Sequence, residues 1–187
     1  KFTALALTSA MRSAGLQATF RASGQTGIMI AGQGIPIDAV VSDFVSGAAE
    51  SLSPDNDENH WDVIEGQGSL LHPGYAAVSL GLLHGSQPDA IVVCHDATRT
   101  AVSGWEHYPL PTVEECIELN LMLGRPTNPA IRCAGVSVNT SALPEKERLR
   151  YLSELEQDTG LPCFDPLLDS CDEVIEILRE IPAIPGN

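Results

Sequence analysis

Four short stretches of this sequence carry residue types that could do chemistry, and each one directly follows an apolar run. They combine hydroxyl, amide, carboxylate and imidazole groups with glycines, and lie at residues 23–27 (SGQTG), 65–69 (EGQGS), 95–96 (HD) and 139–141 (NTS). In parallel α/β sheets, ligands bind beyond the carboxyl ends of the strands. Any single stretch could be an ordinary polar surface loop, but the four together predict a binding site along one sheet edge.

Glu65 is the first candidate catalytic residue, because it ends the apolar run 60–64 and is followed by Gly66 and Gly68. Glycines have no side chain, so a ligand can approach the backbone closely at this point. A carboxylate in this position could hold Mg²⁺ as a hard oxygen ligand or take a proton as a general base. The third alternative is that Glu65 only closes a strand at a turn.

Two further residues compete with Glu65 for the role of general base. His72 lies in the same loop, and an imidazole can exchange protons near neutral pH. Asp43 is the third candidate, although its position on an expected helix places it less directly at the sheet edge. His72 also has a structural interpretation, as a turn residue followed by Pro73.

Arg21 and the start of the chain could bind anionic groups. The fork of the Arg21 guanidinium matches a carboxylate in two hydrogen bonds. A phosphate-binding P-loop has the form GxxxxGK, with its lysine at the start of a helix and a Ser or Thr soon after. Lys1 and Thr3 at the head of a helix-like stretch fit the end of such a loop, so we expect further sequence, including the loop glycines, upstream.

Composition limits the classes of protein and partner. The chain has 187 residues, of which 43% are hydrophobic and 19% charged, and its net charge is −15. This balance is typical of a folded domain, and so large a negative charge argues against nucleic acid or an anionic membrane as partner. No apolar run reaches the ~18 residues of a membrane span, and no signal peptide is visible. We expect a cytoplasmic protein that binds small molecules.

The five cysteines do not suggest a metal site or disulfides. Their number is odd, no CxxC pair occurs, and Cys94 and Cys133 lie inside apolar runs. This pattern is typical of reduced, buried cysteines in a cytosolic protein. Assembly with a second copy is expected through the small-residue stretch SGAAE or the loop around Trp105, so we expect a homo-oligomer.

Hydrophobic spacing predicts an alternation of strands and helices. Strands are expected over 16–22, 61–64, 89–94, 131–138 and 161–164; helices over 4–14, 37–51, 74–85, 112–123, 144–159 and 171–180. Glycine-rich and irregular loops are expected over 25–34 and 97–111, and an extended tail over 181–187.

Several residues predict where these helices begin and end. Gly15 and Gly85 would end the first and third helices, and Thr112 with Glu115 forms a capping box. Pro144 would be the first residue of its helix, while Asp169 or Ser170 would cap the last one.

The regular alternation predicts crossover connections and a mostly parallel sheet between two layers of helices. No internal repeat or linker divides the chain. We therefore expect residues 1–187 to form a single three-layer α/β domain. An acyl-cysteine intermediate is not expected, since no cysteine follows a strand in a context that would lower the pKa of its thiol.

Several segments of the sequence resemble one family, the C-terminal domain of DgcN-type D-glutamate N-acetyltransferases. They are KFTALALTSAMRSAG, FRASGQTGIMIAGQGIPIDAVVSDFVSGAAE, HWDVIEGQGSLLHPGYAAVSLGLLHGSQPDAIVVCH, YPLPTVEECIELN and GVSVNTSAL. In that family a GTDCxxGKxT loop and an N-terminal domain precede the first helix. The resemblance implies a P-loop-like domain from a longer protein, with Lys1 and Thr3 matching the end of the loop.

A more distant resemblance is to dethiobiotin synthetase and its ATP-using relatives, which share a P-loop, a basic residue before TG, and a VEGxG turn. It implies that Arg21 and Thr26-Gly27 face substrate, that Glu65 holds Mg²⁺ near the phosphates, and that Asn139 reads an adenine.

These observations lead to three hypotheses. The first is an acyltransferase that moves an acetyl group from acetyl-CoA to the amine of D-glutamate. The second is an ATP- and Mg²⁺-dependent ligase or kinase, and the third is a non-catalytic domain that binds a nucleotide or serves assembly. Candidate substrate-binding residues are Arg21, Gln25, Thr26, Gly27, Gly66, Gly68 and Ser69; candidate cofactor-binding residues are Lys1, Thr3 and Asn139.

Overall fold

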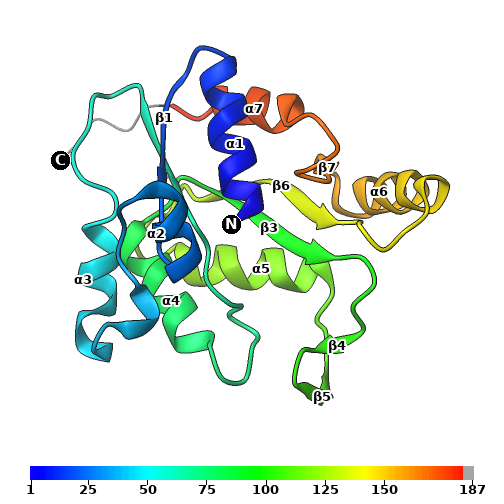
Figure 1. The fold of residues 1–187 in the computed structure, drawn as a ribbon, viewed down its shortest axis with the longest axis horizontal. Coiled ribbons are helices and arrows are strands. Elements are labelled where there is room, and N and C mark those ends of the chain that lie inside the picture. The colour runs from blue at the N-terminus through cyan, green and yellow to red at the C-terminus, as the bar shows by residue number, and fades with distance from the viewer. Residues whose placement is uncertain (183–187) are drawn as a thin grey trace.

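Parallel strands with helices on both faces make up the fold in the computed structural model, which describes residues 1–182 (Figure 1). The α-helices are α1 (Phe2–Ser13), α2 (Gln25–Ala31), α3 (Val45–Glu50), α4 (Ala76–Ser86), α5 (Val113–Gly124), α6 (Glu145–Thr159) and α7 (Asp172–Arg179). Two 3-10 turns, Ile37–Ala39 and Ser42–Phe44, precede α3. The strands are β1 (Gln17–Arg21), β2 (His60–Ile64), β3 (Ala90–Asp96), β4 (Ala101–Val102), β5 (Trp105–Pro109), β6 (Arg132–Asn139) and β7 (Cys163–Phe164).

The expected α/β class with mostly parallel strands is confirmed. β1 pairs with β2 in parallel, and β6 lies between β3 and β7 in a second parallel group. The hydrogen bonds therefore form two parallel groups instead of the single ladder that we expected. In both groups the carboxyl ends are in register: Arg21 lies opposite Ile64, and Asp96 lies opposite Asn139.

Apolar clusters on both faces of the strands give the fold its three layers. On one face α1 and α7 pack against residues of both parallel groups, including Ala18 of β1 and Ala134 of β6. On the other face α5 and α6 cover β6 and β7, while α3 and α4 cover β2. Because α1 contacts both β1 and β6 through one core, it fixes the two groups relative to each other.

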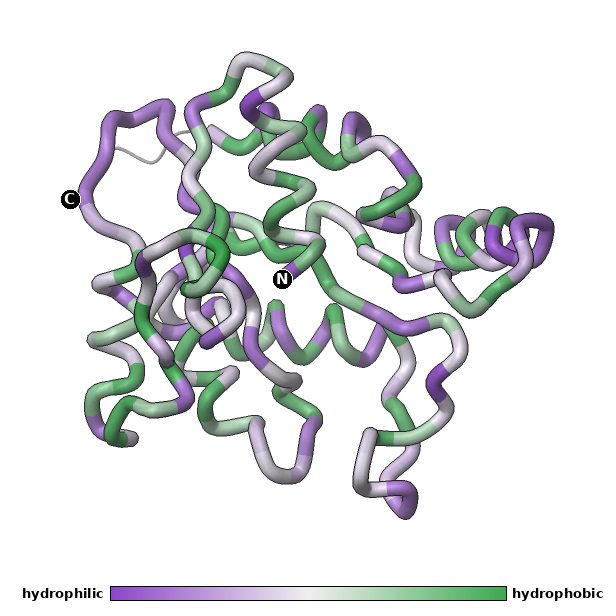
Figure 2. Tube along the Cα trace, in the orientation of Figure 1, coloured by the Kyte–Doolittle hydropathy of each residue, from purple (hydrophilic) through white to green (hydrophobic). Residues whose placement is uncertain are grey.

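β6 has the longest buried run among the described strands, which explains its sequence. Residues 134–138 are all buried, since the strand is paired on both edges and covered on both faces. A strand in this position has a continuous apolar run instead of alternating polar residues. By contrast, the hydrophilic connector 53–60 between α3 and β2 is mostly exposed and runs at the periphery (Figure 2).

Residues 25–34 were expected to form a loop, but residues 25–31 form α2. The seven-residue helix is stabilised by tertiary contacts that the sequence does not reveal: Ile28 packs against the cluster around Phe20 and Ala22. Gly32 ends the helix in the left-handed conformation, with φ of 73°.

The predicted helix 37–51 is wrong over its first half. Val40 and Val41 adopt extended backbone conformations between the two 3-10 turns, as suits β-branched side chains, and only residues 45–50 are α-helical. Val41 and Phe44, two members of the predicted apolar stripe, are each 68% exposed.

Gly85 does not end α4, which continues to Ser86 and is followed by Gln87 with φ of 44°. A side chain on Gly85 would collide with the backbone oxygen of Ser46 and with Ala49. This glycine is therefore required because α3 and α4 approach each other closely. The stretch SGAAE, expected to contact a second copy, belongs to this internal contact.

The region 97–111 is more regular than expected, because β4 and β5 form an antiparallel hairpin inside it. Ser103 and Gly104 connect the strands, and Gly104 has the positive φ, 77°, that such short turns need.

The cap predictions had mixed outcomes. Gly15 follows α1 with φ of 82°, and the capping box of Thr112 and Glu115 is present. Pro144 is the N-cap residue of α6 and not its first helical residue. Cys171 occupies the N-cap position of α7 without a side-chain bond, but the Ser170 hydroxyl accepts the N–H of Asp172, the first residue of the helix, at 3.1 Å. Asp169, the other predicted cap, is engaged with Arg148 instead.

The expected extended tail includes residues 183–187, which lie outside the described residues. Within residues 1–182, none of the helices combines the length and the apolar character that crossing a membrane requires.

The capping box allows a direct test of the fold. Thr112→Ala removes the hydroxyl that accepts the Glu115 N–H, and we expect a loss of about 1 kcal/mol of unfolding free energy. Thermal denaturation should show a melting temperature lowered by about 3 °C. Thr112→Ser keeps the hydroxyl and should behave like the wild type; an equal loss in both variants would contradict the assignment.

Candidate functional site

The loops after β1 and β2 are joined by hydrogen bonds centred on Glu65. Its Oε2 accepts the backbone N–H groups of Ser23 and Gly24, each at 3.2 Å. The Ser23 hydroxyl donates to the Glu65 backbone oxygen at 2.6 Å and accepts from Gln67 Nε2 at 2.7 Å. Glu65 is 5% exposed and Ser23 is fully buried. A carboxyl group can be buried at low cost only when donors satisfy it, and these two loops supply them.

This arrangement explains one of the glycines in SGQTG. A Cβ placed on Gly27 would collide with Oε2 and Cδ of Glu65. Gly27 is therefore required by the close approach of α2 to the carboxylate. Gln25 and Thr26 lie exposed in the first turn of α2, beside this contact.

Three other predicted substrate-binding residues lie open beyond β2. Gly66, Gly68 and Ser69 are exposed, and a side chain at Gly66 would meet no atom within 4 Å. The structure thus leaves the backbone at Gly66 open to approach.

Arg21 is oriented by an ion pair with the neighbouring strand. Its Nε donates to Asp62 Oδ1 at 2.7 Å, and Asp62 also accepts hydrogen bonds from Ser53 and Asn56. Only one side of the guanidinium is used by this pair. The predicted clamp for a substrate carboxylate stays a prediction, with Asp62 as the group that holds Arg21 in place.

His72 makes contacts that bear on its use as a base. Its Nδ1 accepts the Gly74 N–H at 3.0 Å, and its ring stacks on Tyr75 and meets the edge of Trp105. In a neutral imidazole the nitrogen that accepts a hydrogen bond carries no proton, so the proton lies on Nε2. The lone pair of His72 Nδ1 is therefore already used by the Gly74 N–H. Asp43, the third candidate base, lies exposed in the 3-10 turn before α3.

A second group of polar residues gathers where β3 and β6 end beneath the start of α1. Thr3 Oγ1 lies 2.8 Å from Ser137 Oγ and 3.4 Å from Cys94 Sγ. Lys1 is the N-cap residue of α1, whose first turn contains no acidic residue. A helix N-terminus together with a lysine favours anionic ligands.

Asn139 lies at the end of β6 with its amide fixed on both sides. Its Nδ2 donates to Asp96 Oδ2 at 3.1 Å, and its Oδ1 accepts the Ser141 N–H at 3.2 Å. Burial acts to raise the pKa of Asp96, but hydrogen bonds from Thr98 and Asn139, with the charge of Arg99, hold it below its ordinary value. Asp96 is thus an ionised acceptor that orients Asn139.

The side chain of His95, beside Asp96, is held by a contact with α6. Its Nε2 lies 2.6 Å from the Tyr151 hydroxyl, and the two rings stack. Burial lowers the pKa of His95 below its usual value, against the opposing effect of Asp96. A neutral, bonded imidazole facing α6 fits the interpretation of His95 as a structural residue.

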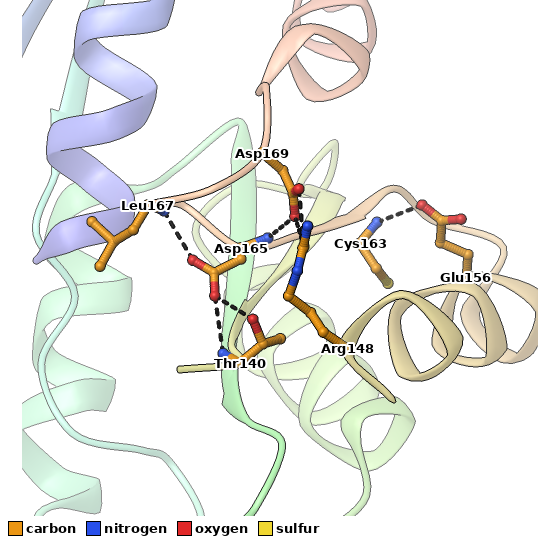
Figure 3. Close-up of polar contacts among 7 residues, drawn as sticks. All are labelled: Thr140, Arg148, Glu156, Cys163, Asp165, Leu167 and Asp169. Carbon is orange, nitrogen blue, oxygen red and sulfur yellow. Dashed lines mark hydrogen bonds and ion pairs between the residues drawn. The ribbon is translucent and has the colours of Figure 1, made fainter. Parts of the chain in front are cut away.

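Sequence reasoning missed the residues that follow β7. Asp165 is 3% exposed and bonds to Thr140, while Asp169 binds Arg148 of α6 (Figure 3). The available signal was an aspartate placed directly after the last strand in CFDP, which is the same pattern that drew attention to Glu65.

The cysteines divide into an exposed one and several unreactive ones. Cys94 is exposed, although it was expected to be buried. Burial raises the pKa of Cys116, Cys133 and Cys171, and raises that of Cys163 to about 11. A thiol with a raised pKa is a poor nucleophile at neutral pH.

The described residues do not bring several metal-binding side chains together. In residues 1–182 there is no group of three or more His, Cys, Asp and Glu side chains that could hold one. Glu65 would therefore be a single carboxylate ligand, and Mg²⁺ at such a site relies on water and phosphate oxygens for its remaining positions.

Comparison with known proteins identifies the family. Residues 1–175 match the DUF1611 family, described as a domain of unknown function (DUF1611_C) P-loop domain. The chain belongs to the DUF1611 family. Lys1 directly precedes α1, as the lysine of a P-loop precedes its helix, whereas Thr3 lies one position beyond the Ser or Thr of that motif, where Phe2 stands.

Two curated relatives carry a functional name. A D-glutamate N-acetyltransferase of Pseudoalteromonas sp is 51% identical over 174 residues, which are 93% of this chain and 52% of that protein. A D-glutamate N-acetyltransferase of Tritonibacter scottomollicae is 46% identical over 180 residues, or 96% of this chain and 54% of that protein. The chain spans about half the length of these relatives.

A solved structure supports the same family and fold. The crystal structure of a DUF1611 family protein from Anabaena variabilis superposes with a TM-score of 0.87 at 34% identity. The match covers 95% of this chain and 52% of that one.

The contact between Gly27 and Glu65 gives a test of the site in this DUF1611 domain. Gly27→Ala places a methyl group against the Glu65 carboxylate, so we expect α2 or Glu65 to shift at a cost of about 1–3 kcal/mol. Denaturant unfolding measures the loss. Gly47→Ala in α3 is the control: its added methyl meets no atom within 4 Å and should stabilise the helix by up to about 1 kcal/mol. Equal effects of the two substitutions would refute the proposed contact.

Proposed function

We propose that the protein carrying this chain transfers an acetyl group from acetyl-CoA to the amine of D-glutamate. The observation that carries the proposal is the name shared by two relatives that match 93% and 96% of the chain at 51% and 46% identity. The two groups of polar residues at the strand ends support it, because a two-substrate reaction needs one site for the acceptor and one for the donor.

The acceptor site in this proposal lies at the ends of β1 and β2. Arg21, held by Asp62 through Nε, would bind a carboxylate of D-glutamate with its terminal nitrogens. The exposed residues Thr26 and Ser69 offer hydrogen bonds from the two adjoining loops. A cation is essential here, since the net charge of −15 would otherwise repel an anionic substrate.

The donor site lies at the ends of β3 and β6. Lys1 and the N-terminus of α1 would bind phosphate groups of acetyl-CoA, and Thr3 lies beside them. Asn139 would bind the adenine edge with the amide hydrogen and the oxygen lone pair that its two internal hydrogen bonds leave over.

The chemical step is a direct attack of the amine on the thioester. The ammonium group of D-glutamate first gives a proton to the base, and its nitrogen then forms a bond to the acetyl carbonyl carbon. The bond from that carbon to sulfur breaks, and the thiolate of CoA leaves and takes up the second proton that the nitrogen releases. No acyl-cysteine forms in this scheme, in agreement with the raised pKa values of the half-buried and buried thiols.

Glu65 is the base that the geometry favours. The backbone amides of Ser23 and Gly24 both bond to Oε2, so Oε1 is the oxygen that would receive the proton. His72 is the competing base, but its Nδ1 already accepts a hydrogen bond from Gly74. Asp43 is the third candidate and lies on an exposed turn.

A second candidate function is an ATP- and Mg²⁺-dependent ligase or kinase, and the P-loop description of the family favours it. In that case Lys1 and Thr3 would bind the phosphates of ATP, with Glu65 beside the metal. The third is a non-catalytic nucleotide-sensing or assembly domain, which would form a stable assembly without turnover. The exposed rings of Trp105 and Tyr108 are the surface that we propose for assembly with a second copy.

Calorimetric titration of the natural protein with acetyl-CoA and with Mg-ATP separates these functions. We expect acetyl-CoA to bind, and mass spectrometry to detect N-acetyl-D-glutamate after D-glutamate is added. Binding of ATP without binding of acetyl-CoA would contradict an acetyltransferase. Binding of neither, by a stable oligomer, would favour the non-catalytic domain.

The base is tested by comparing Glu65→Gln with His72→Ala at several pH values. Gln keeps an oxygen that can accept the Ser23 and Gly24 N–H groups but cannot take a proton. We expect it to lower turnover at least ~100-fold, the lower end of general-base effects, and His72→Ala to have a much smaller effect. Turnover that is unaffected by either substitution would disprove the assignment of the base.

A further inference from the structure

One buried carboxylate joins the loops that follow β6 and β7. Asp165 is the first residue after β7, and its Oδ2 accepts both the N–H of Thr140, at 3.0 Å, and the Thr140 hydroxyl, at 2.5 Å. Its Oδ1 accepts the Leu167 N–H at 2.9 Å. Figure 3 shows the Asp165 side chain between these two loops. The position of Thr140 is therefore set by Asp165.

The loop that carries Asp165 is itself anchored to α6. The Asp165 N–H donates to Asp169 Oδ2 at 2.8 Å, and Arg148 Nη1 contacts both oxygens of Asp169 at 2.8 and 2.9 Å (Figure 3). The helix, the loop after β7 and the loop after β6 are thereby connected through a continuous set of polar contacts.

Asp165 holds its partners as an ionised group. Burial acts to raise the pKa of Asp165, but hydrogen bonds from Thr140 and Leu167, together with the nearby charge of Arg148, hold it below its ordinary value. Three donors converge on the charged form, and hydrogen bonds to an ionised acceptor are stronger than those between neutral groups. The hydrogen bonds that join the two loops through Asp165 are therefore stronger than bonds between neutral groups would be.

On the other side of Thr140, the same loop presents Asn139. Its amide is oriented by Asp96 of β3 and by Ser141, which leave one N–H and one oxygen lone pair of the amide for a ligand. A donor and an acceptor side by side match the edge of an adenine. The exposed side chain of Leu167, whose N–H Asp165 holds, adds apolar surface on the neighbouring loop.

We propose that Asp165 is a positioning residue for nucleotide binding, which acts by fixing Thr140 so that Asn139 faces the base of the ligand. Asp165 does not touch the ligand in this arrangement. The proposal rests on the proposed function only in naming acetyl-CoA as the ligand; the same arrangement would serve the adenine of ATP.

The test is the affinity of the natural protein for acetyl-CoA and for Mg-ATP, measured by calorimetry, together with the KM for D-glutamate. Asp165→Asn removes the charge and leaves an NH₂ group facing donors, either those of Thr140 or the Leu167 N–H. We expect it to weaken nucleotide binding by about tenfold, as when one or two hydrogen bonds behind a binding group are lost. The KM for D-glutamate should stay unchanged, because the acceptor site lies at β1 and β2.

A pair of substitutions at Thr140 provides the second arm. Thr140→Val removes the hydroxyl but keeps the shape and the N–H, and should weaken nucleotide binding several-fold. Thr140→Ser restores the hydroxyl and should restore the affinity. This pair decides the question should Asp165→Asn fail to fold, and equal affinity of the two Thr140 variants would overturn the proposal.

Asn128→Ala is the matched control for a structural effect. Asn128 is also a buried polar residue with several hydrogen bonds, to Gln87, Pro88, Asp89 and Ala130, but it lies at the amino ends of the strands. We expect it to lower the melting temperature without changing nucleotide affinity. An affinity loss equal to that of Asp165→Asn would show that Asp165 is merely structural and would overturn the proposal.

The outcomes also separate this proposal from the proposed function. Nucleotide binding by the wild type without formation of N-acetyl-D-glutamate would contradict the acetyltransferase and leave the effect of Asp165 measurable by calorimetry. Binding of neither acetyl-CoA nor ATP by the wild type would overturn the positioning role itself.

Discussion

A buried carboxyl group must find hydrogen-bond donors, and in this structure that requirement shapes the loops at the carboxyl edge of the strands. Glu65 meets it with the backbone of Ser23 and Gly24 from the loop after β1. Asp165 meets it with Thr140 and Leu167 from the loops after β6 and β7. In both cases a carboxylate that follows one strand fixes the loop that follows its neighbour.

This constraint explains how the polar groups at the strand ends are held in place. The parallel strands bring their carboxyl ends to one side, and α1 packs on both parallel groups, so the two sets of polar residues have a fixed relation. The set around Glu65 and Arg21 contains the proposed acceptor site. The set around Thr3, Asn139 and Asp165 contains the proposed donor site, and a transfer reaction requires these two sites to face one gap.

The sequence predicted what depends on local or periodic features. The buried run of β6 and the capping box at Thr112 are of this kind, and both are present in the structure. Helix α2 was missed because its stability comes from contacts of Ile28 and from Glu65, far along the chain. The hairpin of β4 and β5 was missed although Gly104 marks its turn.

The candidate site was predictable as a place but not as a set of contacts, since hydrogen bonds such as that of Asp165 to Thr140 arise only from folding. A crystal structure with acetyl-CoA and D-glutamate would show whether two substrates bind at the two sets of strand ends. We predict density for the adenosine beside Asn139 and for D-glutamate between Arg21 and Glu65. Density for the adenosine beside Glu65, with none at Asn139, would contradict this assignment of the two sites.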